Sequence, residues 1–333
     1  MNLPFISIII PCRNEEKYIA GCLDSLIAND YAKENIELFI IDGQSRDSTV
    51  AIINSFQARF EFIHFLDNPK KTFPAAVNIG VKASKGEFVF IAGAHAHYDR
   101  DYISKCVTNS IRYNADNIGG NMISKAQNEN FSADIITSAL SNPFGVGNST
   151  FRTGSDKIIN ADTVFGGCYK RDVFDRVGLF NENLISTSDY EFNKRLKRSG
   201  GKILLLPDIK VTYFARSTFK SFLINNFRNG FWSIYPLAFV SYIPVSLRHF
   251  VPLVFLLSLS GSFILSFLFP FFSYLLVMIL IMYFIVALFF SAKTLRLKMI
   301  LFLPFYFFLL HLSYGLGSLV GLVKILFIKV FNR

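Results

Sequence analysis

The C-terminal quarter of this 333-residue chain contains no acidic residue. From residue 250 to the end, the only charged residues are basic: Lys293, Arg296, Lys298, Lys324, Lys329 and Arg333. Removing these six leaves 28 basic and 24 acidic residues, so the first 249 residues carry +4 of the total net charge of +10. This distribution argues against a concentrated nucleic-acid patch, and we expect no nucleic-acid partner.

Cysteine is scarce and lacks paired spacing. The four residues show no C-x-x-C pattern, which favours free, reduced thiols in a cytoplasmic domain: Cys12, Cys22, Cys106 and Cys168. The N-terminus has no basic region, and its apolar run over residues 5–10 is too short for a signal peptide. We expect this run to be the first strand.

Three uncharged segments in the acid-free region are long enough to cross a bilayer, at about 20 residues each. They cover roughly 250–270, 272–291 and 299–322. The basic loop at 292–298 is expected in the cytoplasm by the positive-inside rule, which also places the N-terminal domain there. We therefore expect a multi-pass protein of the plasma (inner) membrane with a cytoplasmic soluble domain.

The third segment conflicts with that rule. If it crosses, it carries Lys324, Lys329 and Arg333 outward. Either the segment is re-entrant or the tail lies in the interface, and the residues leave both alternatives open. The pair Gly317-x-x-x-Gly321 is typical of a helix-packing face.

Strands and helices alternate in the first half. The strands are expected at 5–10, 36–42, 61–67 and 87–92, and the helices at 15–29, 48–60, 74–84 and from Tyr102. This alternation predicts an α/β fold with a largely parallel sheet, whose ligands bind beyond the carboxyl ends of the strands. Those ends carry polar residues at 11–15, 42–45 and 93–97, while residues 142–162 are expected to form a loop.

Several motifs together resemble the family 2 glycosyltransferases, and in particular their membrane-bound succinoglycan-type branch. The matching stretches are ISIIIPCRNEEKYIAGCLDSL, FIIDGQSRDST, LDNPKKTFPAAVNIGVKASKG, NPFGVGNSTFRTG, DTVFGGCYKRDVFDRVGLFNE, SDYEFNKRLKRSGGKI and SLRHFVPLVF. The resemblance spans roughly residues 5–255. It implies the Rossmann-like GT-A fold and inverting transfer from a nucleotide sugar, with a UDP-sugar as the expected donor.

The resemblance implies that Asp42 accepts a hydrogen bond from the nucleotide base. By position alone, Asp42 would instead end a strand, with Asp47 or Ser48 capping the following helix. The resemblance also assigns further residues to the donor site: Pro11, Arg13, Glu15, Lys71 and Asn78. Lys71 would meet a phosphate as a point charge, although a solvated surface lysine is the plain alternative.

Asp189 matches the catalytic base of the family, where its neighbour is Glu or Gln instead of Ser188. Inverting transfer needs one carboxylate to take the proton from the acceptor hydroxyl. The spacing from Ser188 to Glu191 also predicts a capping box at a helix start. The two interpretations are compatible, because a capped first turn would present Asp189 rigidly.

The family places a metal-binding Asp-x-Asp or Asp-Ala-His-Ala motif after the strand at 87–92. This chain has Gly93-Ala94-His95-Ala96, so the first aspartate is missing. The resemblance then implies a divalent cation held by His95, with His97 as a weaker second ligand. Losing a carboxylate favours Mn²⁺ over Mg²⁺. A literal Asp-x-Asp at 99–101 lies where the next helix needs a cap. The alternative to a metal site is that His95 only forms hydrogen bonds at the end of the strand.

Before the membrane region, Arg228 and Trp232 replace the family motif Gln-x-x-Arg-Trp and are four residues apart. The resemblance implies a lid in which Arg228 meets the diphosphate and Trp232 stacks on the acceptor. Trp232 as an interfacial aromatic anchor is an equal alternative.

The sequence thus predicts a cytoplasmic domain at 1–230, an interfacial connector at 231–249 and a membrane domain at 250–333. The expected function is transfer to a lipid-linked saccharide in exopolysaccharide synthesis, since tethering raises the effective concentration of such an acceptor. Two alternatives stay open. One is a non-catalytic scaffold that binds nucleotide sugar, and the other is direct transfer to polyprenyl phosphate.

Overall fold

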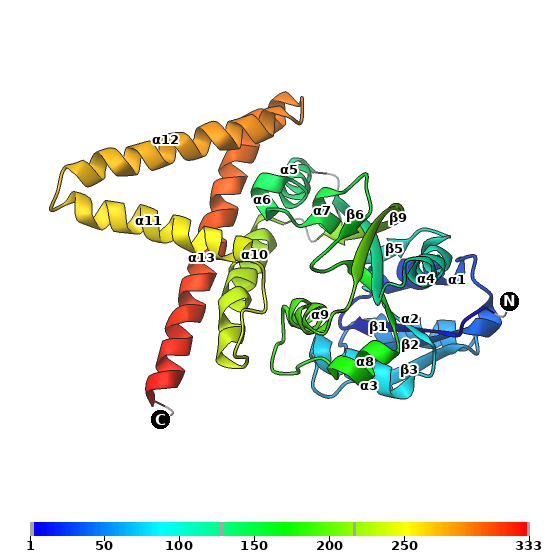
Figure 1. The fold of residues 1–333 in the computed structure, drawn as a ribbon. Coiled ribbons are helices and arrows are strands. Elements are labelled where there is room, and N and C mark those ends of the chain that lie inside the picture. The colour runs from blue at the N-terminus through cyan, green and yellow to red at the C-terminus, as the bar shows by residue number, and fades with distance from the viewer. Residues whose placement is uncertain (1–2, 127–129, 216–217, 332–333) are drawn as a thin grey trace. The chain divides into compact units, whose positions relative to one another are not determined.

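The computed structural model describes residues 3–126, 130–215 and 218–331. The chain forms two compact units (Figure 1). Unit 1 comprises Met1–Lys125 and Thr150–Phe214, and unit 2 comprises Ala126–Ser149 and Ala215–Arg333. This division differs from the expected boundary at residue 230. The segment at 126–149 and the helix that follows residue 218 belong to the same unit as the apolar C-terminal helices.

Unit 1 is built on a mixed sheet with the strand order β3-β2-β1-β4-β8-β6-β9-β5, and β7 pairs with β9. The first four strands run parallel, and β8 then pairs with β4 in the antiparallel direction. The strands are β1 (Ile6–Cys12), β2 (Ile36–Asp42), β3 (Ile63–Asp67), β4 (Phe88–Ile91), β5 (Ala96–Tyr98), β6 (Asn117–Ala126), β7 (Ile159–Asn160), β8 (Phe165–Lys170) and β9 (Ile203–Ala215).

Apolar runs explain the central strands. β2 is buried at all seven positions and β1 at six, as expected for parallel strands covered on both faces by helices. The helices of unit 1 are α1 (Ile19–Ile27), η1 (Lys33–Asn35), α2 (Thr49–Gln57), α3 (Phe73–Ala83), α4 (Tyr102–Tyr113), α7 (Thr150–Thr153), α8 (Asp172–Val177) and α9 (Ser188–Arg198). The predicted α/β alternation is therefore confirmed.

Two local features differ from the sequence analysis. The short strand β5 begins shortly after β4 and pairs with β9, where no strand was predicted. Residues 142–162 were expected to form a loop, but they contain α6 (Pro143–Val146), α7 and β7. Asn142 begins α6 by accepting a hydrogen bond from Phe144 N at 2.9 Å. Such side-chain caps allow a Gly- and Asn-rich segment to form short helices.

Unit 2 is helical. Its elements are α5 (Phe131–Leu140), α6, α10 (Phe219–Ile234), η2 (Tyr235–Ala238), η3 (Leu247–Phe250), α11 (Val251–Ser266), α12 (Phe271–Ala292) and α13 (Leu297–Phe331). Within the described ranges, three stretches are long and apolar enough to cross a membrane: Leu247–Ser266, Phe271–Ala292 and Leu297–Val330. Their number and approximate positions match the three expected segments, which indicates association with a membrane.

Glycine contacts join α10 to α13. A Cβ atom added at Gly230 would lie 1.9 Å from the carbonyl oxygen of Tyr314, and one added at Gly317 would lie 1.9 Å from that of Phe227. No side chain fits at such distances, so the two backbones touch directly. The predicted packing role of Gly317 is confirmed, and it explains why α10 belongs to unit 2.

A Gly317→Val substitution is expected to separate α10 from α13, because the new side chain would overlap the backbone of Phe227. Gly261 in α11 provides a matched control, since a Cβ atom added there meets nothing within 4 Å. Thermal denaturation of the full chain in detergent should show a clearly lower midpoint for Gly317→Val than for Gly261→Val. Equal midpoints would contradict the close contact.

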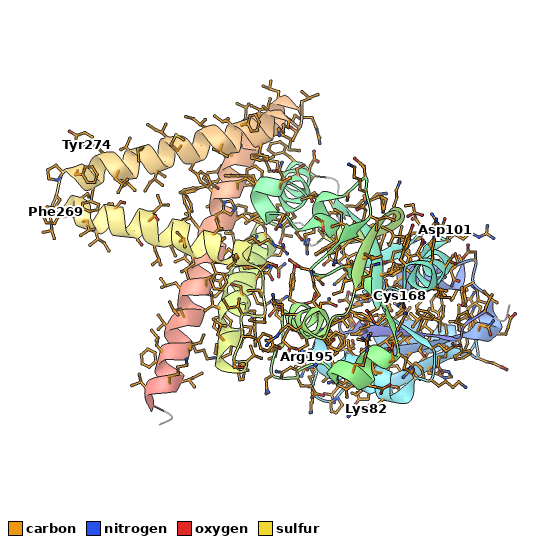
Figure 2. All side chains as sticks on the ribbon, viewed as in Figure 1. Lys82, Asp101, Cys168, Arg195, Phe269 and Tyr274 are labelled. Carbon is orange, nitrogen blue, oxygen red and sulfur yellow. The ribbon has the colours of Figure 1, made fainter. Side chains whose placement is uncertain are left out.

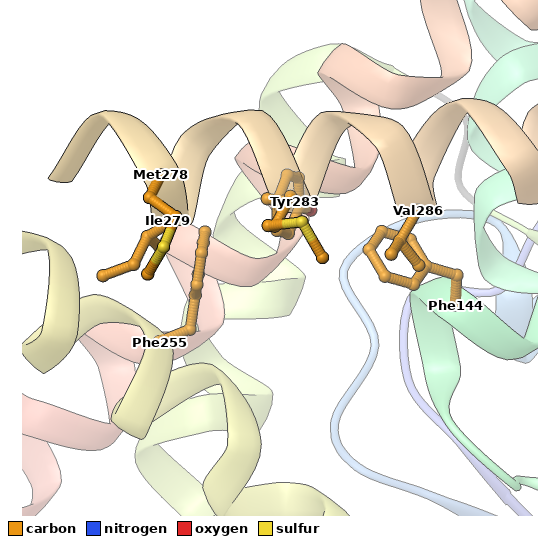
Figure 3. Close-up of a pocket in the computed structure, with 7 residues that line it drawn as sticks. Phe144, Phe255, Met278, Ile279, Tyr283 and Val286 are labelled. Carbon is orange, nitrogen blue, oxygen red and sulfur yellow. The ribbon is translucent and has the colours of Figure 1, made fainter. Parts of the chain in front are cut away.

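An apolar pocket of about 370 Å³ lies between α11 and α12. Phe255, Met278, Tyr283 and Val286 line it, together with Phe144 of α6 (Figure 3). The pocket exposes no polar surface and lies among helices suited to a membrane. It has none of the acid, base or cationic groups needed for group transfer, so we place no catalytic site there.

Candidate functional site

The predicted polar edge of the sheet is present in unit 1. Cys12 pairs in register with Asp42 at the carboxyl ends of β1 and β2, and Ile9 pairs with Ile91 of β4. The residues that follow these three strands therefore emerge at one edge, where parallel sheets bind ligands. The loops after β1 and β2 are also tied together, because Asn14 N donates to Ser45 Oγ at 2.8 Å and Glu15 N donates to Thr49 Oγ1 at 2.7 Å.

Asp42 is buried and engaged in its own turn. Its carboxylate accepts hydrogen bonds from the backbone N–H of Ser45 at 2.8 Å and from the Ser45 hydroxyl. The Cys12 thiol also donates to it over 3.8 Å, and burial together with the nearby carboxylate raises the pKa of this thiol and keeps it protonated. Asp42 thus has the structural role of ending β2 and holding the turn that follows, while its recognition of the nucleotide base stays a prediction.

Glu15 lies beside His95. Glu15 Oε1 is 2.9 Å from His95 Nε2, and both side chains are largely buried. The ring of Tyr18 contacts the imidazole edge-on, with centroids 4.7 Å apart. Among the described residues, His95 Nδ1 has no hydrogen-bond partner. Sequence reasoning assigned these two residues to different tasks, and the structure makes them one nitrogen–oxygen pair.

Phe165 occupies the space next to Gly93, where the family has its first metal-binding aspartate. A Cβ atom added at Gly93 would lie 2.9 Å from the tip of the Phe165 ring, and this ring packs on Tyr213 at 5.4 Å. An aspartate at position 93 would therefore require Phe165 to move. An aromatic ring thus occupies the space where the family's carboxylate would lie.

The other candidate ligands lie elsewhere on the strand and the next helix. His97 is exposed in β5, where it pairs with Thr212 of β9. Asp101 of the literal Asp-x-Asp forms an ion pair with Lys105 at 2.8 Å, at the start of α4. Over the described ranges, no three His, Cys, Asp or Glu residues form a group able to hold a metal ion.

The remaining donor-site candidates differ in their surroundings. Arg13 is exposed and its stem lies 3.2 Å from where a Cβ atom of Gly43 would be, whereas Pro11 is partly buried. Lys71 is exposed in the loop between β3 and α3, with a positive φ of 59°. Asn78 is buried, and its amide bonds the backbone of Phe180 in both directions at 2.9 Å. Its hydrogen-bonding capacity is therefore used to hold the loop before α9.

Asp189 is the second residue of α9 and is partly buried. Burial raises the pKa of its carboxyl, while hydrogen bonds from its own and the next backbone N–H and the charge of Arg152 act in the opposite direction. The predicted capping box is wrong. The N-cap is Thr187 in a left-handed conformation, no side chain caps it, and Glu191 pairs with Arg195 instead.

A buried polar cluster supports the first turns of α9. Asn193, four residues after Asp189, accepts from the Tyr169 hydroxyl at 3.1 Å and donates to Thr163 Oγ1 at 2.8 Å. Asn117 also donates to it, at 3.2 Å. Residues four apart share a helix face, so Asn193 and Asp189 lie on the same face of α9. The cluster therefore anchors this face of α9 to β6 and β8. Sequence spacing alone gave no indication of these partners.

Arg228 and Trp232 lie in unit 2. Both are on α10, as their spacing predicted. Arg228 is exposed, and Trp232 contacts Tyr235 edge-on at 5.4 Å. Their expected contacts with the diphosphate and the acceptor stay predictions.

Comparison with known proteins agrees with the motifs. A model of the glycosyl transferase family 2 matches residues 7–178. The chain is 35% identical over 226 residues to a dolichyl N-acetyl-alpha-D-glucosaminyl phosphate 3-beta-D-2,3-diacetamido-2,3-dideoxy-beta-D-glucuronosyltransferase from Methanococcus voltae, covering 66% of this chain and 70% of that protein. It is 27% identical over 214 residues to the succinoglycan biosynthesis protein ExoA of Rhizobium meliloti, covering 63% of each.

A solved structure supports the fold. The crystal structure of S. aureus TarS in complex with UDP-GlcNAc matches with a TM-score of 0.51 at 20% identity, covering 64% of this chain and 59% of that one. The likeness agrees with the GT-A-like sheet described above. Because the family model matches more than half of the chain, the chain belongs to glycosyl transferase family 2 and is a glycosyltransferase.

Proposed function

We propose that this glycosyltransferase moves a sugar, with inversion, from a UDP-sugar to a lipid-linked saccharide at the cytoplasmic face of the plasma membrane. The observation that carries the proposal is Asp189, a partly buried carboxylate with a raised pKa in the first turn of α9. Perturbed carboxylates of this kind serve as general bases near neutral pH.

The donor class is supported by the sheet edge and by one structural neighbour. TarS has been crystallised with UDP-GlcNAc. In this chain, Asp42, Arg13 and Glu15 lie on the loops that follow β1 and β2, where nucleotides bind in open α/β sheets. We assign the base to the side of Asp42 and the diphosphate to cationic groups, with Lys71 as the candidate in unit 1.

The acceptor class is supported by the apolar helices and by the relative from M. voltae, whose name specifies a dolichyl-linked sugar phosphate. A transferase held at the bilayer encounters a lipid-linked acceptor at a high effective concentration. In the reaction, Asp189 would accept the proton of the acceptor hydroxyl as its oxygen bonds to the anomeric carbon and the nucleoside diphosphate departs.

A divalent cation fits the pair formed by Glu15 and His95. One carboxylate oxygen and one imidazole nitrogen are a donor set that suits Mn²⁺ better than Mg²⁺. We propose Glu15, in place of His97, as the partner of His95 in holding the ion. When bound, such a cation would neutralise charge on the donor diphosphate.

His95→Ala and Glu15→Gln are each expected to weaken Mn²⁺ binding in the presence of UDP by about tenfold or more. Electron paramagnetic resonance of free Mn²⁺ measures this without relying on turnover. His97→Ala is the matched control, and its exposed side chain should change binding little. Unchanged affinity in both His95→Ala and Glu15→Gln would contradict the assignment.

The proposed reaction is tested with the purified full chain in lipid nanodiscs and a panel of UDP-sugars, by measuring release of UDP. We expect release only when a polyprenyl-linked saccharide is present. Release with polyprenyl phosphate alone would favour direct transfer to that lipid. UDP binding without turnover of any donor would favour the non-catalytic scaffold. This alternative is supported by Phe165, whose ring lies beside Gly93, where the family has a metal-binding aspartate.

A further inference from the structure

The third apolar helix is longer than a membrane crossing requires. α13 has 35 residues, which at 1.5 Å per residue gives roughly 52 Å, compared with about 30 Å for the hydrocarbon core. A crossing would also separate Lys324 and Lys329 from the basic residues at its start. Because of these two features, the orientation of α13 relative to the hairpin formed by α11 and α12 determines which helices can cross.

The base of this hairpin contacts α13 at two places. At the start of α11, the carbonyl oxygen of Pro252 lies 2.5 Å from where a Cβ atom of Gly315 would be. Near the end of α12, Ala287 is buried in one cluster with Leu303 and Phe307. These contacts are about 12 residues, or roughly 18 Å, apart along α13. The two ends of the hairpin thus contact α13 at separate levels along its length.

The outer half of the hairpin extends away from α13. Phe267 and Tyr274 are each 76% exposed, and Phe263 and Met278 are each 55% exposed. The figures show α11 and α12 running off together, crosswise to α13, with Phe269 and Tyr274 at the far tip (Figures 1 and 2). Helices that run crosswise cannot both cross the bilayer along its normal.

The positions of the charged residues favour the hairpin as the crossing element. Residues 250–292 contain no charged residue, and α12 has no polar face that could rest in headgroups. α13 carries Lys298, Lys324 and Lys329. Residues 299–323 of α13 are also uncharged and long enough to cross, but a crossing would place Lys298 on one side of the membrane and Lys324 and Lys329 on the other, against the positive-inside rule. The hairpin therefore crosses.

Exposed apolar side chains of α13 lie in two groups, which together are called the stripe below. They are 43–66% exposed: Leu301, Phe302 and Phe305 before the contact with α11, and Leu316, Val320, Val323, Leu326, Phe327 and Val330 after it. The opposite side packs on α10 and α5, with Leu303, Leu310 and Ile325 buried. Both groups of the stripe are exposed and can face lipid, one on each side of the contact with α11.

A lysine of α13 lies against aromatic rings of α10 and η2. Lys324 Nζ lies 4.8 Å from the ring centroid of Tyr235 and 5.6 Å from that of Phe231. Trp232 packs on Tyr235. Tyr and Trp gather at headgroup depth, and lysines there are attracted to anionic lipid.

We propose that α13 lies along the anionic cytoplasmic leaflet with its stripe in the acyl boundary, and that only α11 and α12 cross the membrane. All basic residues described after residue 250 then lie on one side, which removes the conflict with the positive-inside rule. Arg333 lies outside the described residues. In this proposal, the first two expected segments form a crossing hairpin and the third lies at the membrane surface.

Single-cysteine labelling tests the sidedness. The four native cysteines are buried, so background labelling is low. In sealed vesicles of known orientation, a membrane-impermeant maleimide should reach Lys298→Cys and Lys329→Cys from the same face, and Tyr274→Cys from the opposite face. Labelling of Lys329→Cys from the face that exposes Tyr274→Cys would overturn the proposal.

Depth measurements separate a surface helix from a re-entrant one. Spin labels at Leu316→Cys, Val323→Cys and Val330→Cys should show one shallow depth by power saturation with oxygen and a nickel chelate. Labels at Tyr274→Cys, Ile281→Cys and Leu288→Cys on α12 should show a maximum of depth in the middle. A depth maximum along α13 like that along α12 would overturn the proposal. Neither experiment depends on catalytic activity.

Discussion

An Asp189→Asn protein is expected to fold and bind donor like the wild type but to transfer sugar about 10²–10⁴-fold more slowly. The amide has nearly the shape of the carboxylate and can keep its place in the first turn of α9, but it cannot accept the acceptor proton. Initial rates of UDP release with the lipid-linked acceptor measure the loss, and UDP titration checks donor binding. Near-normal turnover in a folded protein would remove Asp189 from the mechanism.

The pH dependence of kcat/KM gives an independent test of the same carboxylate. Burial raises the pKa of Asp189, and a base works only when ionised, so activity should fall as the pH drops through a value above the ordinary 3.8. Arg152 lowers this pKa through its charge. An Arg152→Gln protein should therefore lose activity at a higher pH than the wild type. An acid limb unmoved by this change would show that another group titrates.

Much of the fold was predictable, because buried parallel strands leave a local pattern. The runs that became β1, β2 and β4 are mostly apolar, with Ser7 and Glu37 as exceptions, and the polar residues at their carboxyl ends had to meet at one edge. The membrane segments were likewise visible, since about 20 uncharged residues are needed to cross. These features depend on residues that are neighbours in the chain.

Other features depend on partners far apart in the sequence. The approach of Glu15 to His95 and of Phe165 to Gly93 arises only when the sheet assembles. The assignment of residues 126–149 to unit 2 depends on packing of α5 against α13. Ser188 and Glu191 had the right spacing for a cap, but Arg195 is a stronger partner for a buried carboxylate than a backbone N–H.

Arg195 holds together the segment that leads into Asp189. Its guanidinium donates to both oxygens of Glu191, at 2.6 Å and 3.0 Å, and to the carbonyl of Leu179 at 2.8 Å. It also donates to the carbonyl of Val177 and lies over the ring of Phe192. The Glu191 side chain is only 2% exposed. Removing the arginine would take two charged hydrogen bonds from a buried carboxylate and free the carbonyl groups of Val177 and Leu179 before α9.

Arg195→Met is therefore expected to destabilise the protein by about 3–5 kcal/mol, the usual loss when one partner of a buried pair is removed. For a unit of this size, that corresponds to a thermal midpoint lower by on the order of 10 °C. Lys194→Met is the matched control, because it removes the same charge from an exposed position of α9. A Glu191→Met/Arg195→Met double variant should recover much of the loss, since the buried carboxylate is then replaced together with its cationic partner. Equal midpoints for Arg195→Met and Lys194→Met would show that the pair does not hold this loop.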